Sequence, residues 1–138
     1  MSSIKEMVSR IESLDIERLC EDSFNLNSDI AKELNIEQLQ RGEGAKRDMP
    51  DYSRTSVEVF GKPYGGIRLY ETGEFYEGIN FEAVNQNIYS YSTDEKNDML
   101  ETIYADEQPL GLSGASIAEL NKVIQPTLAE ETKKELGI

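Results

Sequence analysis

Carboxylates are the most abundant side chains in this sequence that could do chemistry, because paired carboxylates can act as general acid and base. They do not recur in a tight pattern, and residues 94–101 lack the alternating ligands and late Glu of a calcium loop. The sequence has no histidine, so the commonest general base and neutral metal ligand is missing. We therefore expect these carboxylates to be solvated charges on helix surfaces and loops. The set is Asp48, Asp51, Glu71, Glu74, Glu77, Asp94, Asp98, Asp106 and Glu107.

Two glycine pairs and one cysteine are the remaining candidates for a chemical site. Gly42-x-Gly44 and Gly65-Gly66 are not followed by the helix and lysine of a phosphate-binding loop, so both pairs predict turns. Cys20 has no histidine to activate it, and we expect it to be a small core residue at the end of a helix. The sequence thus predicts a non-enzymatic chain with no catalytic residue, no cofactor and no metal.

The charge balance restricts the partners. The 138 residues include 27 acidic and 14 basic ones, which gives a formal net charge of −13. Gripping DNA or RNA requires phosphate neutralisation, and anionic membranes also attract basic surfaces, so neither is an expected partner. No apolar run is long enough for a membrane span, and the N-terminus lacks a signal core, so we expect a soluble chain made in a cytoplasm. An acidic surface is then either simply solvated, or repels or imitates nucleic acid.

Aromatic and apolar residues indicate where the chain contacts other subunits. Tyrosine offers contact area and a polar tip, and the seven tyrosines cluster around the predicted strands. Tyr89 and Tyr91 lie two residues apart on one strand, so they should be buried together or exposed together. Core packing alone explains about half of the tyrosines. It is also the more frequent explanation for the apolar stripes of the terminal helices, which could otherwise dock on a neighbour. The predicted interface residues are Phe75, Tyr76, Phe81, Tyr89, Tyr91, Ile117, Leu120 and Ile124.

The N-terminal third predicts helices that would carry part of this surface. Residues 3–20 show apolar residues at helical spacing and predict one amphipathic helix, followed by a turn at 21–27. A second helix is predicted over 29–41, because Ser28 is a suitable N-cap and Gly42 a suitable stop.

The middle of the chain predicts short strands. After a loop at 42–53, the alternating residues 56–60 predict an extended segment that ends at the breaker cluster 61–66, and Ile67, Leu69 and Tyr70 start another.

A β-hairpin is the clearest signal in the sequence. Residues 79–84 and 88–92 flank the polar turn Asn85-Gln86-Asn87. A short helix capped by Thr72 precedes it.

The C-terminal third predicts helices over 94–104, capped by Thr93, and over 116–135, where Pro126 should kink or break the helix. A loop at 106–112 separates them. Residues 1–138 are thus expected to form a single domain of the α+β class, with a small antiparallel sheet packed by N-terminal and C-terminal helices. Its parts are the helical 1–41, the strands and short helix of 54–92, and the helical 93–138.

Several blocks between residues 34 and 112, a little over half of the chain, carry a resemblance. The most distinctive is Thr72-Gly73-Glu74-Phe75-Tyr76, and the others are 34–42, Tyr52, Thr55, 67–69, 92–96 and 111–113. In these blocks the chain resembles a family of small uncharacterised proteins of Bacteroidetes phages and prophages, including crAss-like phages. In element order it is also similar to head–tail joining and tail-completion proteins of tailed phages, although the predicted helix at 94–104 departs from their pattern.

This resemblance implies a structural protein of the virion. The expected role is a ring or adaptor subunit at the head–tail junction, in the neck, connector or tail. Its expected partners are copies of itself and other neck, portal and tail proteins. The alternative is an acidic DNA mimic or anti-defence protein of a phage, which the net charge of −13 motivates.

Overall fold

The computed structural model describes residues 3–62, 65–70 and 73–138 and shows an α+β fold, as predicted. The elements, in chain order, are α1 (Ile4–Glu12), α2 (Ile16–Leu26), α3 (Ser28–Gln40), α4 (Arg54–Phe60), α5 (Glu74–Glu77), β1 (Ile79–Val84), β2 (Asn87–Ser92), α6 (Asn97–Ile103) and α7 (Gly114–Leu136). None of the helices in these described ranges is long and apolar enough to cross a membrane.

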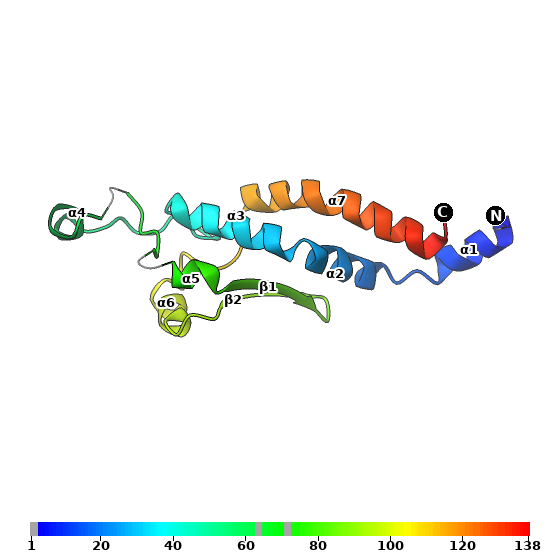
Figure 1. Ribbon diagram of the computed structural model, residues 1–138, viewed down its shortest axis with the longest axis horizontal. Helices are drawn as coiled ribbons and strands as arrows, with labels where there is room; N and C mark the ends of the chain where they lie inside the picture. The colour runs from blue at the N-terminus through cyan, green and yellow to red at the C-terminus, as the bar shows by residue number, and fades with distance from the viewer. Residues whose placement is uncertain (1–2, 63–64, 71–72) are drawn as a thin grey trace.

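The molecule is elongated and built in layers (Figure 1). α2 and α3 follow one another along the long axis and form the middle layer, with α7 packed on one side and the hairpin of β1 and β2 on the other. The core lies between these layers. Its buried members are Phe24, Ala31, Leu39, Phe75, Tyr76, Ile79, Phe81, Ala83, Leu110 and Leu120.

The prediction of one helix over 3–20 followed by a turn is wrong. The helix stops at Glu12, and a new one starts at Ile16, because the Asp15 carboxylate accepts the backbone N–H of Arg18 at 3.1 Å and caps it. This second helix then continues to Leu26, through most of the expected turn. α3 agrees closely with the predicted 29–41, and Gly42 follows it at φ +73°.

The segment 56–60, predicted as extended, is the helix α4. Its Val and Phe residues alternate as in a strand, but no described strand lies beside it to complete a ladder. Instead Ser53 Oγ accepts the N–H of Ser56 at 3.1 Å, and Gly61 ends the helix at φ +69°. The expected extended piece at Ile67 is likewise no strand, since only Gly66 forms an isolated bridge, with Asp51. Pro63 and Tyr64 of the breaker cluster lie outside the described residues.

The hairpin prediction is confirmed. β1 and β2 pair antiparallel, and Val84 pairs with Asn87, so the turn is Asn85-Gln86 and Asn87 belongs to the second strand. Both turn residues have positive φ, +50° and +67°, as a type I′ turn requires. The short helix before the hairpin is α5; its proposed cap, Thr72, lies outside the described residues.

The two C-terminal helices exist, with different ends. α6 starts at Asn97 rather than 94, because the Asp94 carboxylate accepts the Lys96 N–H at 2.8 Å and forms a turn first. α7 starts at Gly114, where Ser113 Oγ caps it, and Pro126 does not break it. Pro126 cannot hydrogen-bond the Lys122 carbonyl, but both residues are exposed, so water can reach that oxygen.

Candidate interaction surface

The side chains with possible chemistry do not come together. Among the described residues, no group of three or more Cys, Asp or Glu side chains is placed to hold a metal ion. Gly44 has its Cα packed so closely on the Glu107 carbonyl that an added Cβ would lie 2.2 Å from that oxygen, so close packing explains the glycine at this position. Cys20 is exposed, so its prediction as a core residue is wrong. The residues that α2 buries are Leu19, Ser23 and Phe24 instead.

The eight residues predicted to form an interface separate into two groups. Phe75, Tyr76, Phe81 and Leu120 are buried within this chain, and Ile124 is half-buried against the same core. Three remain exposed: Tyr89 at 54%, Tyr91 at 42% and Ile117 at 46% of their surface. Tyr89 and Tyr91 are exposed together, as their shared strand face predicted, whereas Ile117 lies on α7 in another layer. Contact with another subunit stays a prediction for all of them.

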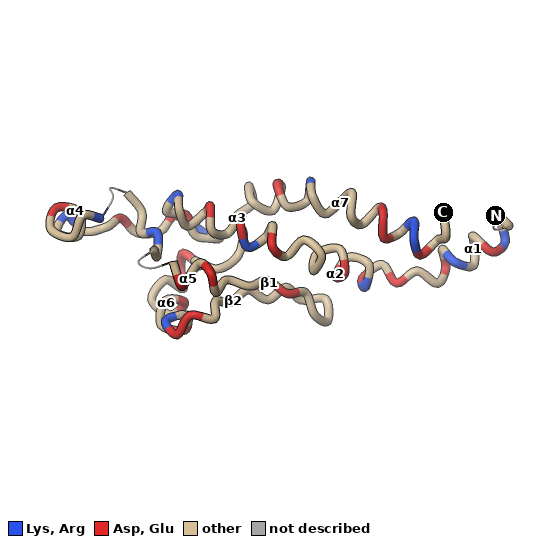
Figure 2. Tube along the Cα trace, in the orientation of Figure 1, with Lys and Arg blue, Asp and Glu red and all other residues tan. Residues whose placement is uncertain are grey.

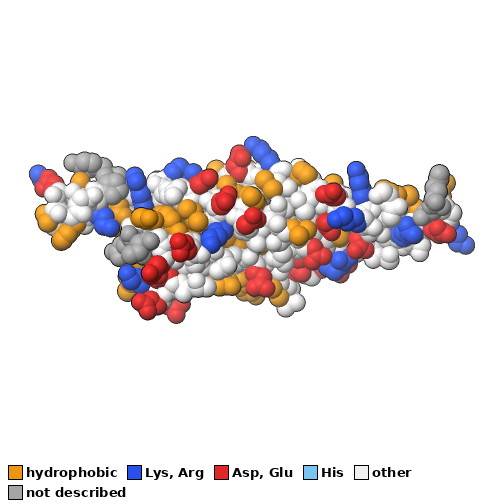
Figure 3. Space-filling view, viewed as in Figure 1, with side chains coloured by type: hydrophobic (Ala, Val, Ile, Leu, Met, Phe, Trp, Pro, Cys, Tyr) orange, Lys and Arg blue, Asp and Glu red, His pale blue; other side chains and the backbone are white. Residues whose placement is uncertain are grey.

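The outer face of the hairpin carries exposed apolar and aromatic side chains, which we call the hairpin surface and define as Val84, Tyr89 and Tyr91. The side chains of Ile79, Phe81 and Ala83 alternate inward along β1, so their neighbours in the sequence point outward. The register places Tyr89 opposite Glu82 and Tyr91 opposite Asn80, both on this outer face. Figure 3 shows hydrophobic side chains along the margin of the hairpin.

Polar side chains on one row of α2 hold the hairpin in place. Asn25 donates to the Ala83 carbonyl at 3.1 Å and accepts the Ala83 N–H at 2.9 Å. At the turn, Glu21 accepts the backbone N–H of Gln86, and Glu17 accepts its side-chain amide. Glu17, Glu21 and Asn25 are spaced four residues apart and thus lie on one helix face. Sequence reasoning missed this row, although its four-residue spacing was a visible signal.

An apolar hollow of about 270 Å³ lies under the tip of the hairpin. Ile16, Cys20 and Phe24 line it from α2, and Ala83 and Ile88 line it from the hairpin. The side chain of Ile88 belongs to the inward face but stays 61% exposed. β2 therefore overhangs the helix layer, which contacts mainly β1.

The helix α1 also carries uncovered apolar side chains. Ile4 is 85%, Val8 46% and Ile11 50% exposed, and no residue of this helix is buried. Its main contact among the described elements is with α7, where Arg10 Nη1 donates to the Leu136 carbonyl at 2.9 Å. A nine-residue helix with an open apolar stripe gains little from its own chain, so its stability depends on further packing.

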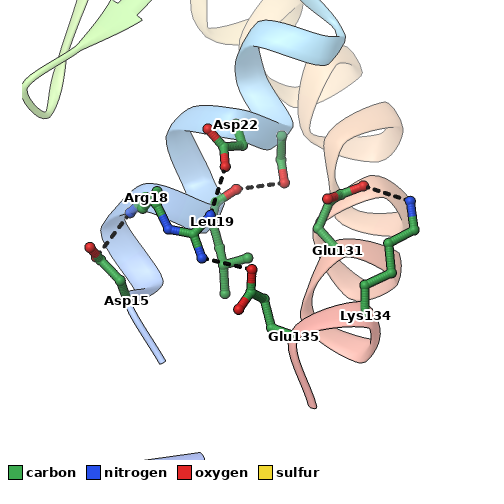
Figure 4. Close-up of polar contacts among 8 residues, drawn as sticks. Asp15, Arg18, Leu19, Asp22, Glu131, Lys134 and Glu135 are labelled. Atoms are coloured by element: carbon green, nitrogen blue, oxygen red, sulfur yellow. Dashed lines mark hydrogen bonds and ion pairs between the residues drawn. The ribbon is translucent and has the colours of Figure 1, made fainter. Parts of the chain in front are cut away.

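The charges are mixed along the whole length (Figure 2). In Figure 4, Arg18 of α2 bonds Asp22 at 3.1 Å and reaches across to Glu135 of α7 at 2.8 Å. The hydrogen bond and charge of Glu135 raise the pKa of Arg18, which therefore stays protonated. In contrast, β2 (Asn87–Ser92) contains no charged residue, although the chain has a net charge of −13.

No family model, curated protein or solved structure matches this chain. The hairpin surface and α1 are the exposed apolar features that bear on the function of this chain.

Proposed function

We propose that this protein is a non-catalytic structural subunit that assembles with copies of itself. The observation that supports this most is the hairpin surface, where two tyrosines and Val84 are exposed on the same outer face of a well-formed strand pair. Single exposed apolar residues are normal, but a grouped patch is typical of an interaction site. Aromatic side chains, tyrosine among them, are enriched in such contacts.

The virion is the setting that we propose, on the basis of the resemblance to small phage proteins. There the chain would be a ring or adaptor subunit at the head–tail junction or in the tail, bound to its own copies and to neck, portal or tail proteins. An elongated, layered subunit with apolar surfaces on its hairpin and on α1 suits contacts to two neighbours. An excess of carboxylates would also repel DNA that passes close to the assembly.

The mixed charge pattern favours this role over that of a DNA mimic. A mimic requires carboxylates spaced like phosphates along one face. Here basic side chains interrupt the acidic ones: Arg18 lies between Asp15 and Asp22 on α2, and Lys122 pairs with Glu119 on α7 at 3.0 Å. Such ion pairs shorten any continuous negative row.

Light scattering on the purified chain, over a wide concentration range, tests the proposal. We expect a discrete multimer with a mass that is a fixed multiple of 15.6 kDa. A monomer at every concentration, together with its absence from purified virions by mass spectrometry, would overturn the proposal. Capture of a host nuclease by a monomeric chain would support the DNA-mimic alternative instead.

A further inference from the structure

The outer edge of β2 has unpaired backbone groups. In a hairpin closed by the pair Val84–Asn87, alternate residues direct their N–H and C=O groups away from the partner strand. Two contacts identify the alternate set: Asn25 bonds both backbone groups of Ala83 from outside β1, and the Asn97 side chain accepts the outward N–H of Ser92. Ile88 and Ser90 belong to the same set as Ser92. Among the described residues, nothing hydrogen-bonds their outward groups.

The two edges of the hairpin therefore differ in how far the rest of the chain covers them. The β1 edge is covered at Ala83 by Asn25 and lies against α2 and α3. The β2 edge is bonded by α6 only at its Ser92 end, and from Ile88 to Tyr91 no described helix side chain hydrogen-bonds it. Ile88, Tyr89 and Tyr91 are all exposed. Natural edge strands usually carry a lysine, a proline or another charge that prevents pairing with a further strand. β2 has the sequence Asn-Ile-Tyr-Ser-Tyr-Ser and carries none of these.

We propose that this edge pairs with the β2 edge of a second copy of the chain, antiparallel, so that two hairpins form one continuous sheet. Ile88 would pair with Ser90 of the second copy, and Ser90 with its Ile88, each pair exchanging both backbone hydrogen bonds. Tyr89 would then lie directly opposite Tyr89 of the second copy, on the two-fold axis. This register uses the free groups of Ile88 and Ser90 and leaves the Ser92–Asn97 bond intact.

Charge and symmetry favour a second copy as the occupant. Two chains with a net charge of −13 repel one another on balance, and β2 is an uncharged segment at which they can approach closely. An antiparallel strand edge is also complementary to itself, as a two-fold contact requires. The pairing would give the overhanging β2 a neighbour and place the tyrosines of both copies on one face, where aromatic cross-strand contacts add stability.

This inference rests on the proposed function, because it names one contact of the assembly. A two-fold contact closes on itself and yields a dimer. Any larger ring would then be built from dimers through another surface, for which the open stripe of α1 is available.

Cysteine cross-linking tests the register directly. In a Cys20→Ser background, Tyr89→Cys places two thiols on a non-hydrogen-bonded pair whose Cα atoms are about 4.5 Å apart, within disulfide range. Tyr91→Cys is the matched control on the same face. Its thiols would be about 13 Å apart, four residues of strand, and too far to bond. We expect Tyr89→Cys to form a disulfide dimer at least about tenfold faster.

A second variant tests the edge without a cysteine. Ser90→Pro removes an outward N–H that the hairpin itself does not use, so far-UV circular dichroism should stay unchanged. Light scattering should then show a smaller mass than that of the wild-type assembly, and the chain mass of 15.6 kDa if the assembly is a dimer. Val84→Pro is not a suitable control, because Val84 pairs within the hairpin; Asn121→Glu, at an exposed position of α7, should keep the wild-type mass.

The outcomes separate this contact from the proposed function. A wild-type multimer in which Tyr89→Cys and Tyr91→Cys cross-link at equal rates, and Ser90→Pro keeps its mass, overturns the β2 contact but leaves self-assembly standing. A wild-type monomer at every concentration that forms no cross-link overturns both. Protection of the Ile88 and Ser90 amides from hydrogen exchange only after a different protein is added also overturns the β2 contact.

Discussion

Asn25 binds Ala83 through both polar atoms of its side-chain amide, as donor at 3.1 Å and acceptor at 2.9 Å. The amide thus takes the place that a neighbouring strand would occupy beside β1. It also joins the helix layer to the hairpin at a point 58 residues away in the sequence.

We expect Asn25→Ala to destabilise the protein by about 1–2 kcal/mol, because two hydrogen bonds are lost and the Ala83 groups must find water. Urea unfolding followed by circular dichroism measures this. Asn121→Ala, at an exposed amide on α7, is the control and should have almost no effect. Equal destabilisation by the two substitutions would contradict the role of Asn25.

A second pair of amides fixes the loop before α7. Asn35 and Gln38 are fully buried on α3, and both bond the backbone between Pro109 and Ser113. Each side chain donates to one carbonyl and accepts from one N–H, so together they act as a short strand edge.

Asn35→Leu should therefore cost about 1–3 kcal/mol, because the Gly111 N–H and Pro109 carbonyl are left buried without a partner. Gln40→Leu, on the exposed end of the same helix, provides the comparison. Thermal unfolding of both variants is the measurement, and a Tm for Asn35→Leu at or above that of Gln40→Leu would refute the explanation.

Tyr76 makes stability depend on pH at the alkaline end. Burial raises the pKa of Tyr76 to about 12, and its hydroxyl donates to the Arg68 carbonyl. An unfolded tyrosine ionises near pH 10, so between pH 10 and 12 the unfolded state binds fewer protons than the folded state. Rising pH therefore favours the unfolded state in this interval. The Tyr76 contribution is complete below pH 10 and is lost as pH rises towards 12, by up to about 3 kcal/mol.

Tyr76→Phe should reduce the decrease in the free energy of unfolding between pH 9 and pH 11. Urea unfolding at the two pH values measures it. The variant is expected to be less stable than wild type at pH 9, where the hydrogen bond to Arg68 is missing, and closer to it at pH 11. If the two proteins lose the same stability over this interval, ionisation of Tyr76 does not govern it.

The ion pair of Arg18 and Glu135 should matter little for stability. Both side chains are nearly half exposed, so water and salt screen the attraction between α2 and α7. A double-mutant cycle of Arg18→Ala and Glu135→Ala should show a coupling close to the error of the measurement, smaller still in 0.5 M NaCl. A large, salt-independent coupling would contradict this.

Local signals determined which elements could be predicted from the sequence. The hairpin and α3 were recognisable because alternation, turn residues and a terminal glycine agree with one another. The helix α4 was not recognisable, because Val57, Val59 and Phe60 favour a strand. With no described strand beside it, the segment instead forms the helix that Ser53 caps. Similarly, the break before α2 depends on one carboxylate, Asp15.

The candidate surface was predictable in part. Alternation placed Tyr89 and Tyr91 on one face, but it does not reveal which face the helices cover, and so it did not separate them from the buried Phe81. The prediction of Cys20 as a core residue was wrong for the same reason, because Cys20 lies next to the buried Leu19 on a helix that is exposed on one side. The overhang of β2 depends on the whole arrangement of layers, which no local pattern encodes.

The helix α4 stands apart from the layers at one end of the molecule, with no buried residue and with Arg54 88% exposed (Figure 1). A protease that cuts the chain once there would separate α1–α3 from all later elements. α3 would still pack on both β1 and α7, so the two pieces would remain associated. We therefore expect the two pieces to behave as complementary fragments, whose reassembly from separately made peptides would require α2 and α3 to pack again on β1 and α7.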